Sequence, residues 1–278
     1  MGIALKPLAA MEWVPADRVI ATQDSRRASA FLRSSELVRA RYLRCRSAWE
    51  PHLRKTRCAI ERGIQRCPHH RTALILGGGM LHDLPIETLA HCFERVVLVD
   101  VVHLWRSVLA AKKFPNVTQV CVDLSGFIPA VEGDGPSVGM PGGLMALGPA
   151  DLVVSLNLMS QLAVVPRLEA GSKGDSETLD ALGQRMVANH LASLNRVGGE
   201  VTLITDIERW EIFPDGRQRS VGDLLFGVNP GPFDEEWVWT IGPIPEVSTE
   251  YHVAHRVGVR HWTAPQGMRS LGTGDFDV

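Results

Sequence analysis

The sequence predicts an α/β fold built on a mostly parallel sheet, and two features support this prediction. From Thr72 onward, short apolar runs alternate with stretches of helical periodicity, which is the pattern of consecutive βαβ units. The first apolar run ends in Gly77-Gly78-Gly79, a turn that lets the backbone approach a ligand closely. The chain has 278 residues, 45% of them apolar, and is long enough to bury the core of such a sheet.

The segment before the first strand predicts two helices, from Ser25 to about Cys67. Apolar residues recur there at helical spacing, and Pro51 fits the first turn of the second helix. The recurring residues are Phe31, Val38, Tyr42, Cys45 and Trp49. We expect residues 1–70 to form a helical extension that packs on a core domain of residues 71–278. The segment is basic, with twelve Lys and Arg against three Glu, and this face either meets an anionic partner or is only solvated.

Strand and helix patterns alternate through the core domain. The expected strands cover 73–76, 95–100, 117–123, 151–156 and 200–205, and the expected helices cover 84–93, 103–113 and 177–195. Between Gly126 and Pro149 the chain is dense in glycine and proline, and we interpret this insertion as a wall of the active site. Two extended segments, Trp237–Ile241 and Tyr251–His261, predict an antiparallel pair added at the sheet edge.

Composition narrows the range of functions. A net charge of −2 gives no reason to expect a polyanionic partner across the whole surface. The N-terminus lacks the features of a signal peptide, and no apolar run is long enough to span a membrane, so we expect a cytoplasmic protein. The five cysteines are widely spaced without a Cys-x-x-Cys pair, which predicts neither a disulfide framework nor a zinc site, and we expect no metal.

The residues that end or directly follow the predicted strands are the candidates for a binding site, because ligands of open α/β sheets lie beyond the carboxyl ends of the strands. They are Gly77, Asp100, Asp123, Asn157 and Asp206. An acidic residue at the end of the second strand is able to accept hydrogen bonds from two ribose hydroxyls. Glycines after the first strand and an aspartate after the second together predict a nucleoside pocket.

The glycine-rich loop distinguishes between two kinds of nucleoside ligand. A dinucleotide fingerprint requires Gly-x-Gly-x-x-Gly, and here Gly77 and Gly79 match but His82 stands at the third position. Asp83 follows, and its carboxylate would repel a pyrophosphate while attracting the cationic amino-acid end of S-adenosylmethionine. The loop therefore disfavours a dinucleotide and favours S-adenosylmethionine.

Three segments carry a resemblance to a known family. They are Leu74-Ile75-Leu76-Gly77-Gly78-Gly79-Met80-Leu81-His82-Asp83-Leu84-Pro85, then Val97-Leu98-Val99-Asp100, and Asp151-Leu152-Val153-Val154-Ser155-Leu156-Asn157-Leu158-Met159-Ser160-Gln161-Leu162. They resemble the class I S-adenosylmethionine-dependent methyltransferases, particularly bacterial members with Asp-Leu-Pro after the first loop and Ser-Gln-Leu after the fourth strand. The resemblance covers about Thr72 to Asp206.

This resemblance implies a Rossmann-like, seven-stranded, mostly parallel sheet with helices on both faces and an antiparallel last strand. It implies that Gly77 and Gly79 lie under the methionine moiety, that Asp100 binds the ribose and that Asp123 lies near the adenine amino group. Gly78, between the two loop glycines, is a further candidate cofactor-binding residue. Asn157 would border the methyl-transfer site. The sequence departs from the family where Leu81 stands in place of the third loop glycine, and also where many members carry an acid just before the strand end.

The predicted activity is methyl transfer from S-adenosylmethionine to a small-molecule acceptor. The candidate catalytic residues are Asn157, Asp206 and His82; Asp83 joins the cofactor-binding residues, and the candidate substrate-binding residues are Ser160, Gln161 and Trp210. Methyl transfer needs alignment of the acceptor and, for some acceptors, removal of a proton. We expect no membrane partner, and a nucleic acid is disfavoured because the sequence carries no recognisable nucleic-acid-binding module. Methylation of base amino groups is disfavoured in particular, because the fourth strand is followed by Asn-Leu-Met-Ser and not by Asn/Asp-Pro-Pro-Tyr/Phe. The oligomeric state is open.

Two alternatives stay open at this point. A nicotianamine-synthase-like enzyme would use S-adenosylmethionine to transfer an aminocarboxypropyl group. A binding or scaffold protein would keep the fold without the chemistry, since a fold does not guarantee an activity.

Overall fold

The computed structural model describes residues 25–125, 149–170 and 175–265. The expected glycine- and proline-rich insertion, apart from Pro149, lies outside these residues. The strands are β1 (Thr72–Leu76), β2 (Arg95–Asp100), β3 (Val117–Cys121), β4 (Leu152–Leu156), β5 (Gly199–Ile212), β6 (Gln218–Asp223), β7 (Glu235–Gly242) and β8 (His252–Ala264). The helices are α1 (Ser25–Arg66), α2 (Ile86–Cys92), α3 (Trp105–Ala111), the 3-10 turn η2 (Met159–Gln161), α5 (Val164–Ala170) and α6 (Ser176–Val197).

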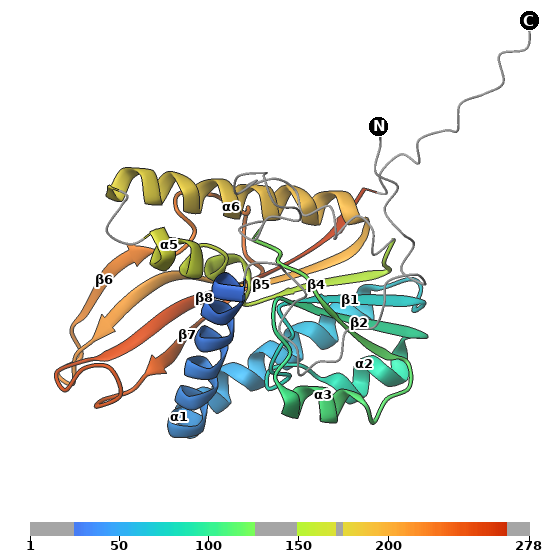
Figure 1. Ribbon diagram of the computed structural model, residues 1–278, viewed down its shortest axis with the longest axis horizontal. Coiled ribbons are helices and arrows are strands. Elements are labelled where there is room, and N and C mark those ends of the chain that lie inside the picture. The colour runs from blue at the N-terminus through green and yellow to red at the C-terminus, as the bar shows by residue number, and fades with distance from the viewer. Residues whose placement is uncertain (1–24, 126–148, 171–174, 266–278) are drawn as a thin grey trace, which may run out of the picture.

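The strands form one sheet in the order β3-β2-β1-β4-β5-β8-β7, with β6 paired to β5 beside this path (Figure 1). Strands β1 to β5 are parallel, whereas β8 runs antiparallel to both β5 and β7. This confirms the predicted Rossmann-like α/β fold, with an antiparallel pair at one edge. Strand β6 adds an eighth strand to the seven that the family resemblance implies.

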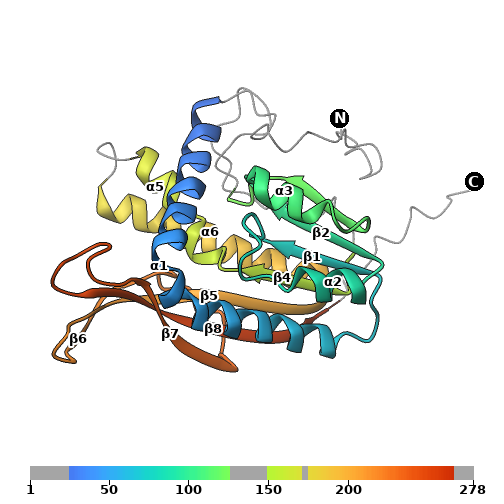
Figure 2. The ribbon, with the colours of Figure 1, turned by 90° about the horizontal axis from the view of Figure 1, so that it is seen from below.

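Each face of the sheet is covered by helices, because alternate residues of each strand point to opposite faces. In β1, Leu74 and Leu76 join a core that includes α6, whereas Ala73 and Ile75 join a second core that includes most of α1. Figure 1 shows α6 on one side of the sheet, and Figure 2 shows α1 and α2 on the other. The prediction of helices on both faces is confirmed.

Strand β5 is much longer than the predicted segment 200–205, and it changes partners on one side. Residues 200–204 pair with β4, and residues 208–212 pair with β6, while β8 follows the other side. Asp206 lies between these two stretches, next to a register shift in the pairing with β8. Bulges of this kind re-aim side chains near active sites. Asp206 is therefore inside a strand and not in the loop that the sequence predicted.

Helix α1 contains the break between the two predicted helices, at Cys45, whose backbone has φ −105° and ψ 17°. Pro51 lies inside the second part and not in its first turn, so the predicted position of the break was wrong by more than a turn. The second part of α1 contacts β7, where Trp49 Nε1 donates to the carbonyl of Ile241 at 3.0 Å. The predicted domain boundary at residue 70 stays a prediction. Helix α1 packs directly on one face of the sheet.

Many of the basic residues of α1 are used in contacts within the protein. Arg62 pairs with Glu235 and Arg66 with Glu200, and both Arg41 and Arg44 pair with Glu246. Arg57 donates to the carbonyl of His82 at 2.8 Å. Within the described ranges, no helix combines the length and the apolar character needed to cross a membrane.

Candidate functional site

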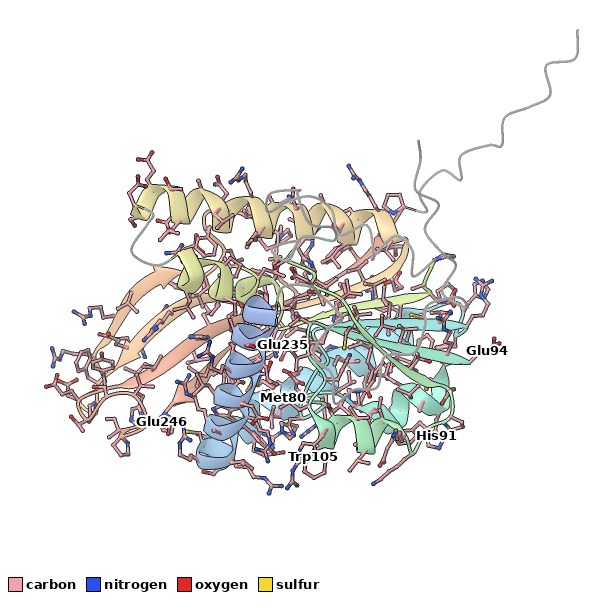
Figure 3. All side chains as sticks on the ribbon, in the orientation of Figure 1. Met80, His91, Glu94, Trp105, Glu235 and Glu246 are labelled. Atoms are coloured by element: carbon pink, nitrogen blue, oxygen red, sulfur yellow. The ribbon has the colours of Figure 1, made fainter. Side chains whose placement is uncertain are left out.

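A pocket of about 320 Å³ lies at the carboxyl ends of the parallel strands. It is lined by strand-end residues of the parallel sheet, including Gly77, Gly79, Asp100, Asp123 and Asn157. Further lining comes from α1, β5, β7 and β8. Met80 of the glycine-rich loop, labelled in Figure 3, lines the pocket as well. The fold thus brings the strand ends predicted from the sequence to one cavity.

The glycine-rich loop is held directly against the end of β2. The Asp100 carboxylate accepts hydrogen bonds from the backbone N–H of Gly79 at 2.8 Å and of Val101 at 2.7 Å. A Cβ atom on Gly79 would lie only 2.6 Å from Asp100 Oδ2, and one on Gly77 would lie 2.5 Å from the carbonyl oxygen of Leu156. Gly77 also has φ +90°. Side chains are excluded from both positions by sterics, and Gly77 needs a conformation that favours glycine.

Leu81 stands where the family resemblance implies a third loop glycine, and its backbone conformation is one that favours glycine. Leu81 has φ +62°, in the left-handed region that costs a residue with a side chain roughly 1–2 kcal/mol. Its partly buried side chain packs against the α1 side of the core. The turn therefore keeps the conformation of a glycine loop although leucine stands in it.

A row of polar contacts leads from the loop to helix α1. Asn157 Nδ2 donates to Asp83 Oδ2 at 3.0 Å and lies 3.4 Å from His52 Nε2. His52 Nδ1 accepts from Trp237 Nε1 at 3.1 Å. Asn157 has φ +48°, a left-handed conformation that asparagine tolerates better than most residues. The side chain of Asn157 thus connects the predicted cofactor side of the pocket with His52.

Burial shifts the ionisation of three of these groups. Burial raises the pKa of Asp83 to about 6, although the hydrogen bond from Asn157 acts in the opposite direction. Burial also raises the pKa of Asp100, and it lowers the pKa of His52 to about 4. His52 is therefore a neutral imidazole at physiological pH. Because Trp237 Nε1 only donates, His52 Nδ1 is the acceptor of their hydrogen bond.

Asp206, Ser160 and His255 meet on the other side of the pocket. Asp206 is 3% exposed, and its Oδ2 lies 3.1 Å from His255 Nδ1 and 3.4 Å from Ser160 Oγ. Trp239 stands directly opposite His255 on the neighbouring strand, and its ring stacks on His52 with centroids 3.9 Å apart. These side chains form a continuous wall from β5 across β8 and β7 to α1.

The remaining predicted residues lie in different places. Asp123 and Gln161 line the pocket, and Asp123 Oδ1 accepts from the backbone N–H of Ser125 at 2.9 Å. His82 also lines it, but its ring stacks on Tyr42 with centroids 3.9 Å apart. Gly78 and Trp210 do not belong to the described lining: Gly78 faces Ile75, and Trp210 lies in the part of β5 that pairs with β6.

Sequence reasoning missed His52 and His255 as pocket residues. His52 comes from a helix outside the family resemblance, and nothing in its helical periodicity distinguishes it from a core position. For β8, a signal was present: His255 and Trp239 lie near the middle of the two predicted C-terminal strands. The register of β8 against β5 brings His255 close to Asp206. This register cannot be predicted from the sequence of one strand alone.

Comparisons with known proteins give a limited result. No family model matches this sequence, and no curated protein matches it. Among solved structures, a DhpI–SAH complex is similar over 84% of this chain and 95% of its own, with 14% identity and a TM-score of 0.37. A 1,6-didemethyltoxoflavin-N1-methyltransferase of Burkholderia thailandensis is similar over 89% and 97%, with 14% identity and a TM-score of 0.38. TM-scores this low carry no argument about function, which has to rest on the site itself.

Proposed function

We propose that this protein is an S-adenosylmethionine-dependent methyltransferase that acts on a small-molecule acceptor. The observation that carries the proposal is the convergence of Gly79, Asp100, Asp123 and Asn157, from the ends of four different parallel strands, on one pocket. Such a pocket at the carboxyl edge of a doubly wound sheet is where this architecture binds nucleosides. The hydrogen bond from the glycine-rich loop to Asp100, through the Gly79 N–H, supports a nucleoside ligand in particular.

The charges of the pocket fit S-adenosylmethionine better than a dinucleotide. Four carboxyl groups line it, those of Asp83, Asp100, Asp123 and Asp206, and within the described lining there is no lysine or arginine. A pyrophosphate would meet negative charge without a cationic side chain, whereas an ammonium group would be attracted. When bound, S-adenosylmethionine supplies a methyl group on a sulfonium, from which an acceptor lone pair displaces the neutral thioether.

The roles of the residues follow from their positions in this proposal. Asp100 accepts hydrogen bonds from ribose hydroxyls, Asp123 borders the adenine, and Asp83 attracts the ammonium group. Gly77, Gly78 and Gly79 form the backbone turn beneath the methionine moiety. Asn157, Asp206 and Ser160 border the acceptor, with Gln161 beside them. His82 lines the pocket, and this position alone supports a role as proton acceptor. Its ring stacks on Tyr42, which restricts its approach to a substrate.

Calorimetric titration of the purified protein with S-adenosylmethionine, S-adenosylhomocysteine and NAD tests the proposal. We expect saturable binding of the first two and none of NAD. Asp100→Ala should weaken binding at least tenfold, and Asp100→Asn, which keeps the shape of the side chain, should weaken it as well. Asp215→Ala is the matched control, because Asp215 pairs with Arg217 in the exposed turn before β6. A preference for NAD would overturn the proposal.

Product analysis separates the proposed reaction from the two alternatives. Methyl transfer releases S-adenosylhomocysteine, whereas transfer of the aminocarboxypropyl group releases methylthioadenosine. Binding of S-adenosylmethionine without either product across a broad acceptor screen would favour a non-catalytic protein.

A further inference from the structure

The pocket has a second part, distinct from the glycine-rich loop. Trp49, His52, Trp239, His255 and Asp206 line it, from α1, β7, β8 and β5. Their contacts are continuous: the ring of Trp239 lies 4.8 Å from that of Trp49 and 3.9 Å from that of His52, and edge-on at 6.1 Å to that of His255. We call these five residues together with Asn157 the acceptor subsite.

Polar atoms of the acceptor subsite are buried without hydrogen-bond partners in the described protein. They are Asn157 Oδ1, Asp206 Oδ1 and Trp239 Nε1, on residues that are 8%, 3% and 5% exposed. His255 Nδ1 lies 3.1 Å from Asp206 Oδ2 but not in hydrogen-bonding geometry. Burying a polar group without a partner costs about 1–3 kcal/mol, so native structures seldom retain such groups without a reason. Three of them on one cavity wall indicate a ligand that satisfies them.

The unpartnered atoms determine which hydrogen-bonding groups the ligand carries. Trp239 Nε1–H donates. Asn157 Oδ1 and Asp206 Oδ1 accept. The ligand therefore carries both a hydrogen-bond acceptor and an N–H or O–H group. An anionic ligand is disfavoured, because Asp83 and Asp206 line the pocket while its described lining includes no lysine or arginine.

We propose that the acceptor subsite binds a small, uncharged molecule whose reacting oxygen or nitrogen carries a proton, and that His255, whose Nδ1 lies 3.1 Å from Asp206 Oδ2, takes this proton. The proposal rests on the proposed methyltransferase function. The bond from the oxygen or nitrogen to the methyl carbon forms while the carbon–sulfur bond breaks and its electron pair goes to the sulfur. The proton of the acceptor passes to the His255 imidazole, and the Asp206 carboxylate stabilises the resulting imidazolium.

The binding part of the proposal is tested with protein saturated with S-adenosylhomocysteine and a panel of matched small molecules. The panel consists of phenol, 3-hydroxypyridine and benzimidazole, their O- or N-methyl counterparts, and 4-hydroxybenzoate. Binding is followed at the indole N–H resonance of Trp239, assigned with Trp239→Phe. The indole of Trp262, which donates to Asn195 at 2.9 Å and does not belong to the described pocket lining, is the internal control.

We expect the protonated compounds to shift the Trp239 resonance and not that of Trp262. Their methylated counterparts should bind at least about tenfold more weakly, and Asp206→Asn should reduce this preference. The carboxylate should not bind. Equal binding of methylated and protonated compounds, binding that leaves Trp239 unaffected, or no binding by any panel member at millimolar concentration would each overturn the proposal.

Proton transfer to His255 is tested with 4-nitrophenol, whose anion is yellow. At a pH below its own pKa, binding to the wild-type protein should increase the yellow anion, and His255→Gln should abolish this increase. His261→Gln is the control, because His261 lies on the same strand but contacts Thr202 at the opposite edge of the sheet. An increase that His255→Gln leaves unchanged would remove His255 as the proton acceptor.

The two proposals fail in different ways. If S-adenosylhomocysteine does not bind, the methyltransferase proposal fails, and the panel is then tested on the free protein. A shift of Trp239 there would retain the acceptor subsite as a binding site. If S-adenosylhomocysteine binds and the panel does not, the subsite proposal alone fails.

Discussion

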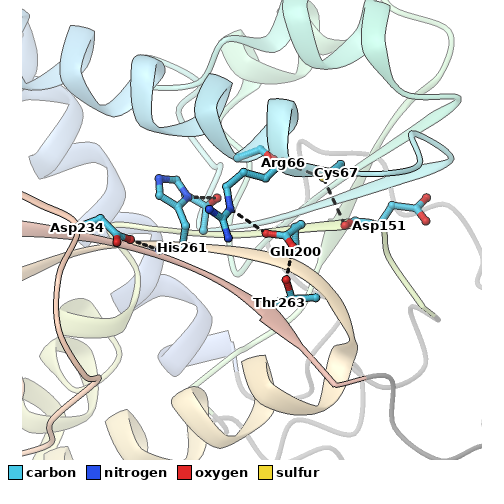
Figure 4. Close-up of polar contacts among 9 residues, drawn as sticks. Arg66, Cys67, Asp151, Glu200, Asp234, His261 and Thr263 are labelled. Atoms are coloured by element: carbon cyan, nitrogen blue, oxygen red, sulfur yellow. Dashed lines mark hydrogen bonds and ion pairs between the residues drawn. The ribbon is translucent and has the colours of Figure 1, made fainter.

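The two edges of the sheet use similar side chains in opposite ways. At the amino ends of the strands, acidic side chains accept hydrogen bonds from neighbouring residues. Figure 4 shows Glu200 with its partners Arg66 and Thr263. Glu200 accepts from Arg66 Nε at 3.0 Å and from the Thr263 hydroxyl, and Asp151 accepts from Arg71 and from the backbone N–H of Thr72 at 3.0 Å. At the carboxyl ends, Asp206 and Asn157 each keep a buried oxygen without a hydrogen-bond partner.

This difference indicates that charged groups stabilise the fold at the amino edge and are available for ligand binding at the carboxyl edge. Although burial acts in the opposite direction, hydrogen bonds from Arg71 and Thr72 lower the pKa of Asp151, so the folded protein favours its charged form. In Asp83 at the carboxyl edge, burial raises the pKa to about 6, and the folded protein disfavours the charge. The amino edge stabilises the fold through its charges, whereas the carboxyl edge carries charges that only a ligand would compensate. Substitutions at the two edges should therefore separate stability from binding.

The largest effect is expected from Gly79→Ala at the carboxyl edge. The added Cβ would lie 2.6 Å from Asp100 Oδ2 and 2.7 Å from the carbonyl oxygen of Val102, so the loop and Asp100 have to move apart. We expect affinity for S-adenosylhomocysteine to fall at least about 100-fold, or about 2.8 kcal/mol, in calorimetric titration. Gly222→Ala in β6 is the matched control, since a Cβ there would have no atom within 4 Å. Unchanged affinity in Gly79→Ala would show that the loop does not hold the nucleoside.

Asp83→Asn should separate stability from binding as a function of pH. The folded-state pKa of about 6 exceeds the usual 3.8, so the folded protein binds a proton more tightly than the unfolded chain does. The charge of Asp83 therefore destabilises the fold above pH 6, and this cost disappears as the pH falls toward the unfolded-state value. The shift corresponds to about 3 kcal/mol at most, and the partial exposure of Asp83 to the pocket reduces it to about 1–2 kcal/mol.

Two measurements check this prediction. In thermal denaturation, Asp83→Asn should be more stable than the wild type at pH 8, and the difference should shrink at pH 5. In calorimetric titration at pH 8, the variant should bind S-adenosylmethionine about tenfold more weakly, because an attraction to the ammonium group is lost. A variant that gains stability equally at both pH values would argue against a titrating Asp83 carboxyl.

The amino edge should show the reverse result in Glu200→Gln. This change keeps the shape of a side chain that is 8% exposed but removes its charge, while Arg66 stays 47% exposed to solvent. Because water screens the arginine, we expect a loss of about 1 kcal/mol in the free energy of unfolding by urea denaturation, and unchanged affinity for S-adenosylhomocysteine. Glu235→Gln is the control: it removes an ion pair to Arg62 in which both side chains are about 40% exposed, and it should change little. Weakened binding in Glu200→Gln would mean that the two edges are coupled.

The carboxyl edge was largely predictable from the sequence because parallel strands all end there. Any polar residue that directly follows a buried apolar run is brought to that edge, and Asp100, Asp123 and Asn157 were found in this way. The two extended C-terminal segments predicted the antiparallel pair, and the family resemblance implied a mostly parallel, seven-stranded sheet. Both predictions depend on local patterns that recur within about ten residues.

The rest of the pocket was not predictable because it depends on register and on contacts between distant segments. His52 comes from α1 and meets Trp239 across 187 residues of sequence, and only the packing of α1 on β7 brings them together. The full length of β5 was missed because its second half, which pairs with β6, carries charged residues instead of a continuous apolar run. Trp210 was expected in the substrate site, but it lies in that second half and not in the described pocket lining.

The smallest effect, and the one that tests the departure from the family pattern, is expected at Leu81. Replacing Leu81 by glycine removes roughly 1–2 kcal/mol of left-handed backbone strain but loses a partly buried side chain and adds about 0.5–1 kcal/mol of chain entropy. These effects nearly cancel, so Leu81→Gly should change the free energy of unfolding by less than about 1 kcal/mol.

Comparison with Leu81→Ala isolates the backbone contribution, because alanine loses the same packing but keeps a Cβ atom at φ +62°. Alanine is ordinarily more stabilising than glycine, whereas here we expect Leu81→Gly to be at least as stable as Leu81→Ala in urea denaturation. Both variants should bind S-adenosylhomocysteine as the wild type does, since the Leu81 side chain faces the core and not the described pocket lining. If alanine proved clearly the more stable of the two, the left-handed turn would not constrain residue 81. If glycine raised the affinity, leucine would be weakening the loop that holds the nucleoside.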